Sequence, residues 1–65
     1  MRILFWAERD TAEHVDLSET TSKLLKIESR RLRQRQADIL REIFSLFGEV
    51  TEANLLQYLN SRATD

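Results

Sequence analysis

Apolar side chains recur through the middle of the chain with the spacing of an α-helix. Between Leu17 and Phe47 no glycine or proline interrupts them, and strong helix formers fill the polar positions. At about 100° per residue, one face of this helix gathers apolar residues from successive turns. They are Leu25, Leu32, Ile39, Ile43 and Leu46. Most are spaced as in a coiled-coil seam, so the pattern predicts a long helix over residues 16–47, with a break near Ser29 as the alternative.

Local end signals bound this helix and predict a second one. Asp16 followed by Glu19 has the spacing of a capping box, and Gly48 suits the left-handed position that ends a helix. Thr51 is a good N-cap for a helix over residues 51–61. We therefore predict a helical hairpin made of a long central helix, a glycine turn and a short C-terminal helix.

Residues 1–15 give a mixed signal. The run Ile3–Trp6 suits a strand by residue type, whereas the following AERDTAEH favours a helix. The pattern indicates no second strand, so a strand here would have to pair with the same strand of another copy. We expect instead an arm or a short helix. Its aromatic residues Phe5 and Trp6 would lie on the core or on a dimer interface rather than anchor a membrane or a partner.

The size of the chain favours self-association. It has 65 residues and no cysteine, and a chain of this length buries only about 60% of its unfolded surface. We expect a single all-α domain over residues 1–65 that assembles with copies of itself, most simply a dimer, as a helical bundle. The expected oligomer interface comprises Leu25, Leu32, Ile39, Ile43, Leu46, Phe5 and Trp6.

Charge divides the chain into blocks around a net charge of −1. Residues 8–21 carry five acidic residues and one basic residue, whereas residues 23–41 carry seven basic residues and two acidic ones. On the predicted long helix a basic face lies opposite the apolar seam. It comprises Lys23, Lys26, Arg30, Arg33 and Arg41.

Like charges one helical turn apart, such as Lys26 and Arg30, make this basic face mildly unfavourable in isolation. Three kinds of partner would relieve the repulsion: the acids of residues 8–19 in the same chain or a second copy, an acidic partner protein, or a phosphate backbone. The isoelectric point of about 5.8, and the lack of aromatic residues among the arginines, argue against nucleic acid. We expect a solvated or internally paired face.

One segment resembles a known family. RQADILREIFSLFGEVTEANLLQYLNSR, residues 35–62, looks like the first two helices of winged-helix and helix-turn-helix regulators, with GEVT as the connection between them. The resemblance covers under half of the chain and implies a helix on each side of GEVT. In that family the base-reading recognition helix follows, and here it would begin at RATD.

Signals for chemistry are weak. His14 is the only histidine, and Asp10 before it indicates a surface ion pair rather than a catalytic pair. A single glycine cannot form a phosphate-binding loop, and the acids of residues 8–16 lack the pattern of a calcium loop. We expect no enzyme activity, no metal and no cofactor. The apolar run Ile3–Ala7 is too short for a signal peptide or a membrane span, so we expect a soluble, intracellular protein of the cytoplasm.

These expectations combine into one functional hypothesis and one alternative. The hypothesis is a small self-associating module that acts in regulation or as an adaptor, through protein–protein contacts with itself and with another protein. The alternative is a nucleic-acid-binding transcriptional regulator that uses the arginine-rich helix face. Salt dependence of binding separates the two, because contacts to phosphates weaken steeply as salt rises.

Overall fold

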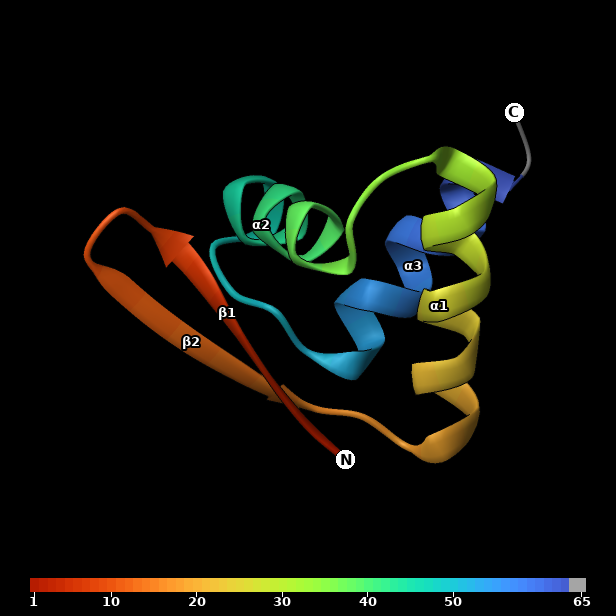
Figure 1. The fold of residues 1–65 in the computed structure, drawn as a ribbon, viewed down its shortest axis with the longest axis horizontal. Helices are drawn as coiled ribbons and strands as arrows, with labels where there is room; N and C mark the ends of the chain where they lie inside the picture. Colours follow the sequence, from red (N-terminus) through yellow and green to blue (C-terminus); the bar gives the residue numbers. More distant parts are fainter. Residues whose placement is uncertain (64–65) are drawn as a thin grey trace.

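A β-hairpin precedes three helices in the computed structural model, which describes residues 1–63 (Figure 1). The elements are β1 (Arg2–Glu8), β2 (Thr11–Asp16), α1 (Glu19–Leu32), α2 (Gln36–Phe47) and α3 (Glu52–Ala63). The hairpin and α1 lie at opposite ends of the long axis, α2 packs beside β1, and α3 contacts both other helices. The arrangement is α+β. The prediction of an all-α helical hairpin is therefore wrong.

The hairpin folds because one of its faces packs on the helices. β1 and β2 pair antiparallel, with Ile3 opposite Val15. Phe5 and Val15 are buried and Ile3 is partly buried against them, so the inner face belongs to the core. Arg9 and Asp10 form the turn between the strands, and neither has a positive φ. The turn therefore needs no glycine.

The expectation of an arm or short helix over residues 1–15 fails for two physical reasons. Leu4 and Trp6 point outward from β1 yet are apolar, which hides the alternation typical of a half-buried strand. The residues of β2, TAEHVD, have little strand preference apart from Thr11 and Val15. Pairing with β1 and burial of Val15 hold this second strand in place, and neither effect is visible in local sequence.

The expected long helix is two helices, because the chain turns at Arg33. Arg33 adopts the left-handed conformation, with φ 56° and ψ 40°. Its N–H donates to the carbonyl of Arg30 at 3.2 Å, and the N–H of Gln34 donates to the carbonyl of Ser29 at 2.9 Å. These bonds satisfy carbonyl groups that the helix end leaves without partners. The break therefore falls after Leu32 rather than at Ser29.

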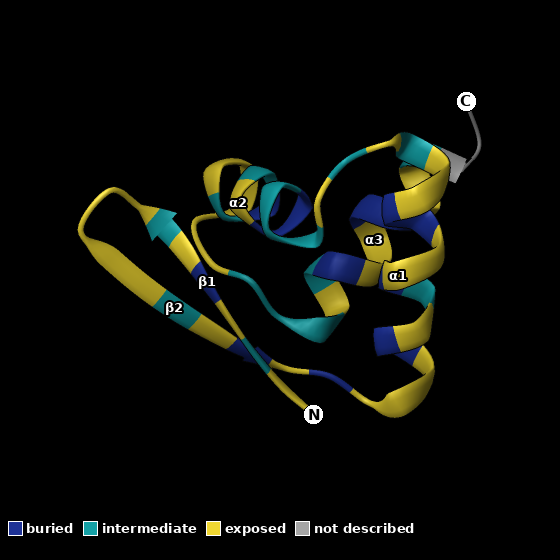
Figure 2. Ribbon diagram, viewed as in Figure 1, coloured by how far each residue is buried: buried dark blue, intermediate teal, exposed yellow. Residues whose placement is uncertain are grey.

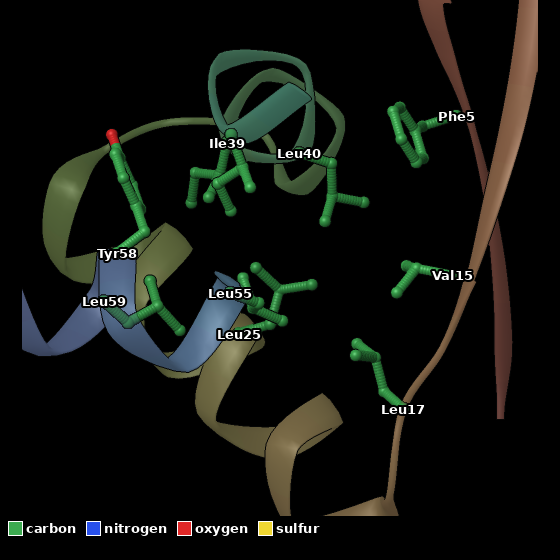
Figure 3. Packing of buried hydrophobic residues seen from close by; sticks show 10 residues of the cluster. Phe5, Val15, Leu17, Leu25, Ile39, Leu40, Leu55, Tyr58 and Leu59 are labelled. Carbon is green, nitrogen blue, oxygen red and sulfur yellow. The ribbon is translucent and has the colours of Figure 1, made fainter. Parts of the chain in front are cut away.

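One apolar core joins the hairpin to all three helices (Figure 3). Phe5, Val15 and Leu17 point from the hairpin side toward the helices, where Leu40 and Leu55 meet them. Helix spacing places the helical members of the core on inward faces. The buried cluster comprises Phe5, Val15, Leu17, Leu25, Ile39, Leu40, Ile43, Leu55, Tyr58 and Leu59. Figure 2 shows that burial is concentrated between the elements, while the turn end of the hairpin is exposed.

A polar contact at the rim of the core fixes α2 against α3. The hydroxyl of Tyr58 donates a hydrogen bond to Oε2 of Glu42 at 2.5 Å. Burial of the ring, together with this bond, raises the pKa of Tyr58 to about 12. The hydroxyl therefore remains a protonated donor at physiological pH, and the buried oxygen has a partner.

Hydrogen bonds at the junction between the hairpin and α1 tie the two halves of the fold together. The backbone N–H of Ser18 donates to Oε2 of Glu52, the first residue of α3, at 2.7 Å. The hydroxyl oxygen of Ser18 accepts from the N–H of Thr21, so Ser18 rather than Asp16 is the N-cap of α1. The hydrogen bond from the N–H of Ser18 is the main cause that lowers the pKa of Glu52. Hydrogen bonds from the side chains of Ser18 and Thr21 lower it further.

The predicted connection between the last two helices is confirmed. Gly48 lies at the end of α2 with φ 80°, and its N–H donates to the carbonyl of Phe44 at 2.8 Å. The hydroxyl oxygen of Thr51 accepts from the N–H of Asn54 at 3.1 Å, which is the expected cap at the start of α3. Both residues were recognisable because end signals of helices are local in sequence.

Gly48→Ala should destabilise the fold by about 1 kcal/mol, because the left-handed conformation costs a residue with a Cβ roughly this much. A Cβ at this position meets nothing within 4 Å, so the cost comes from the backbone and not from a clash. Urea denaturation of Gly48→Ala and of Ser45→Ala, an exposed control in α2, measures the difference. Equal midpoints for Gly48→Ala and the parent would contradict the assigned turn.

Glu52→Gln should lower stability at neutral pH and should remove part of the acid sensitivity of the parent. The lowered pKa of Glu52 means that the unfolded chain takes up a proton at higher pH than the folded chain does. This contribution is therefore present above the ordinary carboxyl value of 4.5 and is lost as the pH falls below it. Thermal melts from neutral to acidic pH test it, with the exposed Glu49→Gln as the control. A Glu52→Gln curve parallel to that of the parent would refute the role of the junction.

Candidate functional site

The predicted basic face is divided among three parts of the chain, with Lys23, Lys26 and Arg30 in α1, Arg33 at the turn after it and Arg41 in α2. Lys23 pairs with Glu19 on α1 at 3.7 Å, and Arg41 pairs with Asp38 on α2. Among residues 1–63, Lys26, Arg30 and Arg33 form no ion pair. Lys26 lies in the middle of α1, Arg30 lies in its last turn, and Arg33 lies where the chain turns into α2.

The acids of residues 8–19 do not neutralise these three cations. Asp16 pairs with Arg2 across the hairpin at 3.4 Å, and Glu19 pairs with Lys23 within α1. The hairpin that carries the other acids lies at the far end of the molecule from α1 (Figure 1). These acids therefore do not pair with the three cations of the same chain. Solvent, a second copy or an external partner remains to neutralise them.

The chain turn concentrates positive charge further. Arg33 occupies a left-handed position that glycine would adopt with less strain, and Arg35 is the N-cap of α2 without a capping side-chain hydrogen bond. We refer to these two residues, with Lys26 and Arg30 of the preceding helix, as the cationic corner. A strained backbone that carries an unpaired charge is a candidate for function rather than for stability.

The hairpin leaves its other face uncovered. This outer hairpin face consists of the residues that alternate with the buried ones: Arg2, Leu4, Trp6, Ala12, His14 and Asp16. Leu4 is 73% exposed and Trp6 is 60% exposed, which is far from the burial typical of these side chains. A shallow hollow of about 180 Å³ lies between them, and Ala12 forms part of its wall. The Arg2–Asp16 ion pair borders the apolar area.

A second uncovered apolar surface lies between α1 and α3. This α1–α3 groove has a volume of about 520 Å³. Its lining residues are Leu24, Glu28, Leu56, Gln57, Leu59 and Asn60. The volume falls within the range of about 300–1,000 Å³ that is typical of binding sites.

One wall of the α1–α3 groove holds a carboxylate that is already neutralised. Only 11% of the Glu28 side chain is exposed, and its Oε2 accepts from Nε of Arg31 at 2.8 Å and from a terminal nitrogen at 2.6 Å. The bond to Glu28 raises the pKa of Arg31. Pairing of this kind removes most of the cost of a charge in an apolar wall.

The predicted oligomer interface is split by the fold. Leu25, Ile39, Ile43 and Phe5 are buried in the core of the chain itself, and Leu32 is partly buried against that core. Trp6 and Leu46 remain well exposed, but they belong to the hairpin and to α2. A contact with a second copy that uses Trp6 would therefore involve residues beside Trp6 on the hairpin. It would not involve the apolar seam, most of which is buried.

Sequence reasoning missed Leu4 and the α1–α3 groove. The available signal for Leu4 was the uninterrupted apolar run Ile3–Trp6, because a strand with one buried face should alternate with polar residues. The groove had no comparable signal. Its walls come from α1 and α3. These helices are separated in the sequence by α2 and become neighbours only in the folded chain.

The expected surface ion pair between Asp10 and His14 does not form. His14 lies in β2 opposite Leu4 and not one helical turn after Asp10, which sits in the hairpin turn. No three His, Cys, Asp or Glu residues gather in the geometry of a metal site within residues 1–63. Over the same residues, no helix has the length and hydropathy needed to cross a membrane.

Comparisons with protein-family models, with curated proteins and with solved structures find no match for this chain. The outer hairpin face, the α1–α3 groove and the cationic corner are therefore the features on which a function can be argued.

Proposed function

We propose that this protein is a small interaction module that associates with copies of itself and acts in regulation or as an adaptor through protein–protein contacts. The observation that carries the proposal is the exposure of Leu4 and Trp6 side by side on the outer hairpin face. Apolar surface with a polar border is typical of interaction sites. Tryptophan is also among the residues that contribute most to binding energy at interfaces.

The rigidity of this surface supports the same proposal. Phe5 lies between Leu4 and Trp6 in β1 and is buried in the core, so the backbone of the outer hairpin face is held in place. A surface that is ordered before binding loses less conformational entropy on association. Two-stranded hairpins are marginal alone, and this one depends on its packing against α2.

Sedimentation velocity at increasing concentration tests the proposal. The parent protein should change from monomer to dimer or larger species as its concentration rises through the micromolar range. Leu4→Thr removes exposed apolar area but keeps strand preference, so it should weaken association by about tenfold while unfolding like the parent. A folded parent that remains monomeric, with a melting temperature independent of concentration, would contradict the proposal.

The cationic corner favours a second candidate function, binding to nucleic acid as a transcriptional regulator. Its four side chains, Lys26, Arg30, Arg33 and Arg35, have no ion-pair partner among residues 1–63. Clustered bases without acidic partners are the electrostatic footprint of phosphate binding. The helices on each side of Gly48 also agree with the resemblance to the first part of a helix-turn-helix regulator.

The double variant Arg30→Gln, Arg33→Gln separates this candidate from a solvated surface. Its stability should be within about 0.5 kcal/mol of the parent, because neither arginine side chain forms an ion pair among residues 1–63 and the backbone bond between the two residues is kept. If the corner binds phosphates, affinity for a generic DNA duplex should fall in the variant and should fall steeply with salt in the parent. Lys23→Gln, which removes a paired base, is the control. No duplex binding by the parent at low salt would exclude this candidate.

A further inference from the structure

The α1–α3 groove combines apolar walls with a buried carboxylate. Leu24 of α1 and Leu56 and Leu59 of α3 supply the apolar walls, where the two helices lie against each other (Figure 1). Glu28 is buried and is the one charged residue among those that line the groove within residues 1–63. A buried carboxylate needs hydrogen-bond donors, so the donors that reach Glu28 decide what the groove can hold.

The two oxygens of Glu28 differ in their hydrogen bonding. Both bonds from Arg31 end on Oε2, at 2.8 and 2.6 Å, and no donor within residues 1–63 reaches Oε1. In this part of the chain, Oε1 of Gln34 is the one side-chain polar atom that is fully buried and has no partner, so Oε1 of Glu28 stays accessible. Because Glu28 is otherwise buried and lines the groove, this oxygen is an acceptor that a molecule in the groove can reach.

The charges at the groove favour a neutral molecule with a hydrogen-bond donor. An anion would be repelled by Glu28, and a cation would have to compete with Arg31, which already neutralises that carboxylate. A purely apolar molecule would cover Oε1 and leave it without a donor, which weakens binding. An aromatic ring that carries one N–H or O–H group meets both needs, because it pairs a large apolar body with a polar tip.

We propose that the α1–α3 groove is a binding site for a small neutral aromatic molecule of the indole or phenol class. Its ring lies between Leu24 and Leu56, and its N–H or O–H donates a hydrogen bond to Oε1 of Glu28. The volume of about 520 Å³ accommodates such a ring with a substituent. The apolar walls and the acceptor belong to a single cavity, which suits one compact molecule. This site is separate from the outer hairpin face and does not depend on self-association.

A titration of the parent protein with indole and with 1-methylindole tests the proposal, because the second molecule lacks only the donor. Indole should shift the backbone amide resonances of Leu24 and Leu56 in nitrogen-15 NMR spectra, with an affinity of about 1 mM or tighter for a molecule of its size. We expect 1-methylindole to bind roughly tenfold more weakly, because it covers Oε1 of Glu28 without donating to it.

Glu28→Leu should remove this preference, since no carboxylate is left to accept the bond. The side chain of Arg31 is 47% exposed, so it can return to solvent in this variant. Arg31→Lys is the matched control, because it keeps a cation beside an unchanged carboxylate, and it should retain the preference for indole.

Equal affinity of the parent for the two molecules would overturn the proposal, and so would the absence of shifts at the groove with indole at about 10 mM. N-acetyltryptophanamide presents the same ring between two peptide groups. If it bound more than about tenfold more tightly than indole, the groove would be a site for a polypeptide side chain, and the small-molecule ligand would be wrong. Circular dichroism checks the fold of each variant. The comparison of indole with 1-methylindole on the parent needs no variant and decides the question by itself.

Discussion

The hydrogen bond from the backbone N–H of Ser18 to Oε2 of Glu52 joins segments that are far apart in sequence, at the junction where the hairpin leads into α1. On one side of it, the N–H of Leu17 donates to the carbonyl of Met1 at 2.8 Å, which closes the open end of the hairpin. On the other side, the Ser18 side chain starts α1. The hairpin, α1 and α3 therefore meet at one place, and Phe5 and Val15 are held against the helices.

The sequence predicted those parts of the fold whose causes are local. Gly48 and Thr51 end and start helices through their own backbone and side-chain bonds, and both lie where the pattern indicated. The turn at Arg33 had no local signal, because arginine is a good helix former and seldom takes a left-handed conformation. The apolar spacing continues across this turn, so the sequence indicated one helix where the structure has two. As a result Leu25 and Ile39, expected on one helix face, come from two helices that share a core.

The residues that make the hairpin hard to predict from the sequence also form a candidate site. Leu4 and Trp6 break the alternation of β1, so the strand is hard to recognise, and the same two side chains form the exposed apolar surface. Local patterns tend to fail where a residue serves something other than the fold of its own chain. The α1–α3 groove could not be found from the sequence, because Leu24 and Leu56 become neighbours only through tertiary packing.

Because the hairpin and the helices share one core, the stability of the helices is coupled to binding at the hairpin, even for a molecule that contacts the hairpin alone. Phe5 and Val15 lie on the inner side of the hairpin and pack with Leu40 and Leu55, so detachment of the hairpin would expose the helices as well. A molecule that binds only the outer side of an attached hairpin therefore adds its binding free energy to the stability of helices it never contacts. By the same thermodynamic linkage, a change deep in the helical core alters affinity at the hairpin surface whenever it alters how often the hairpin is attached.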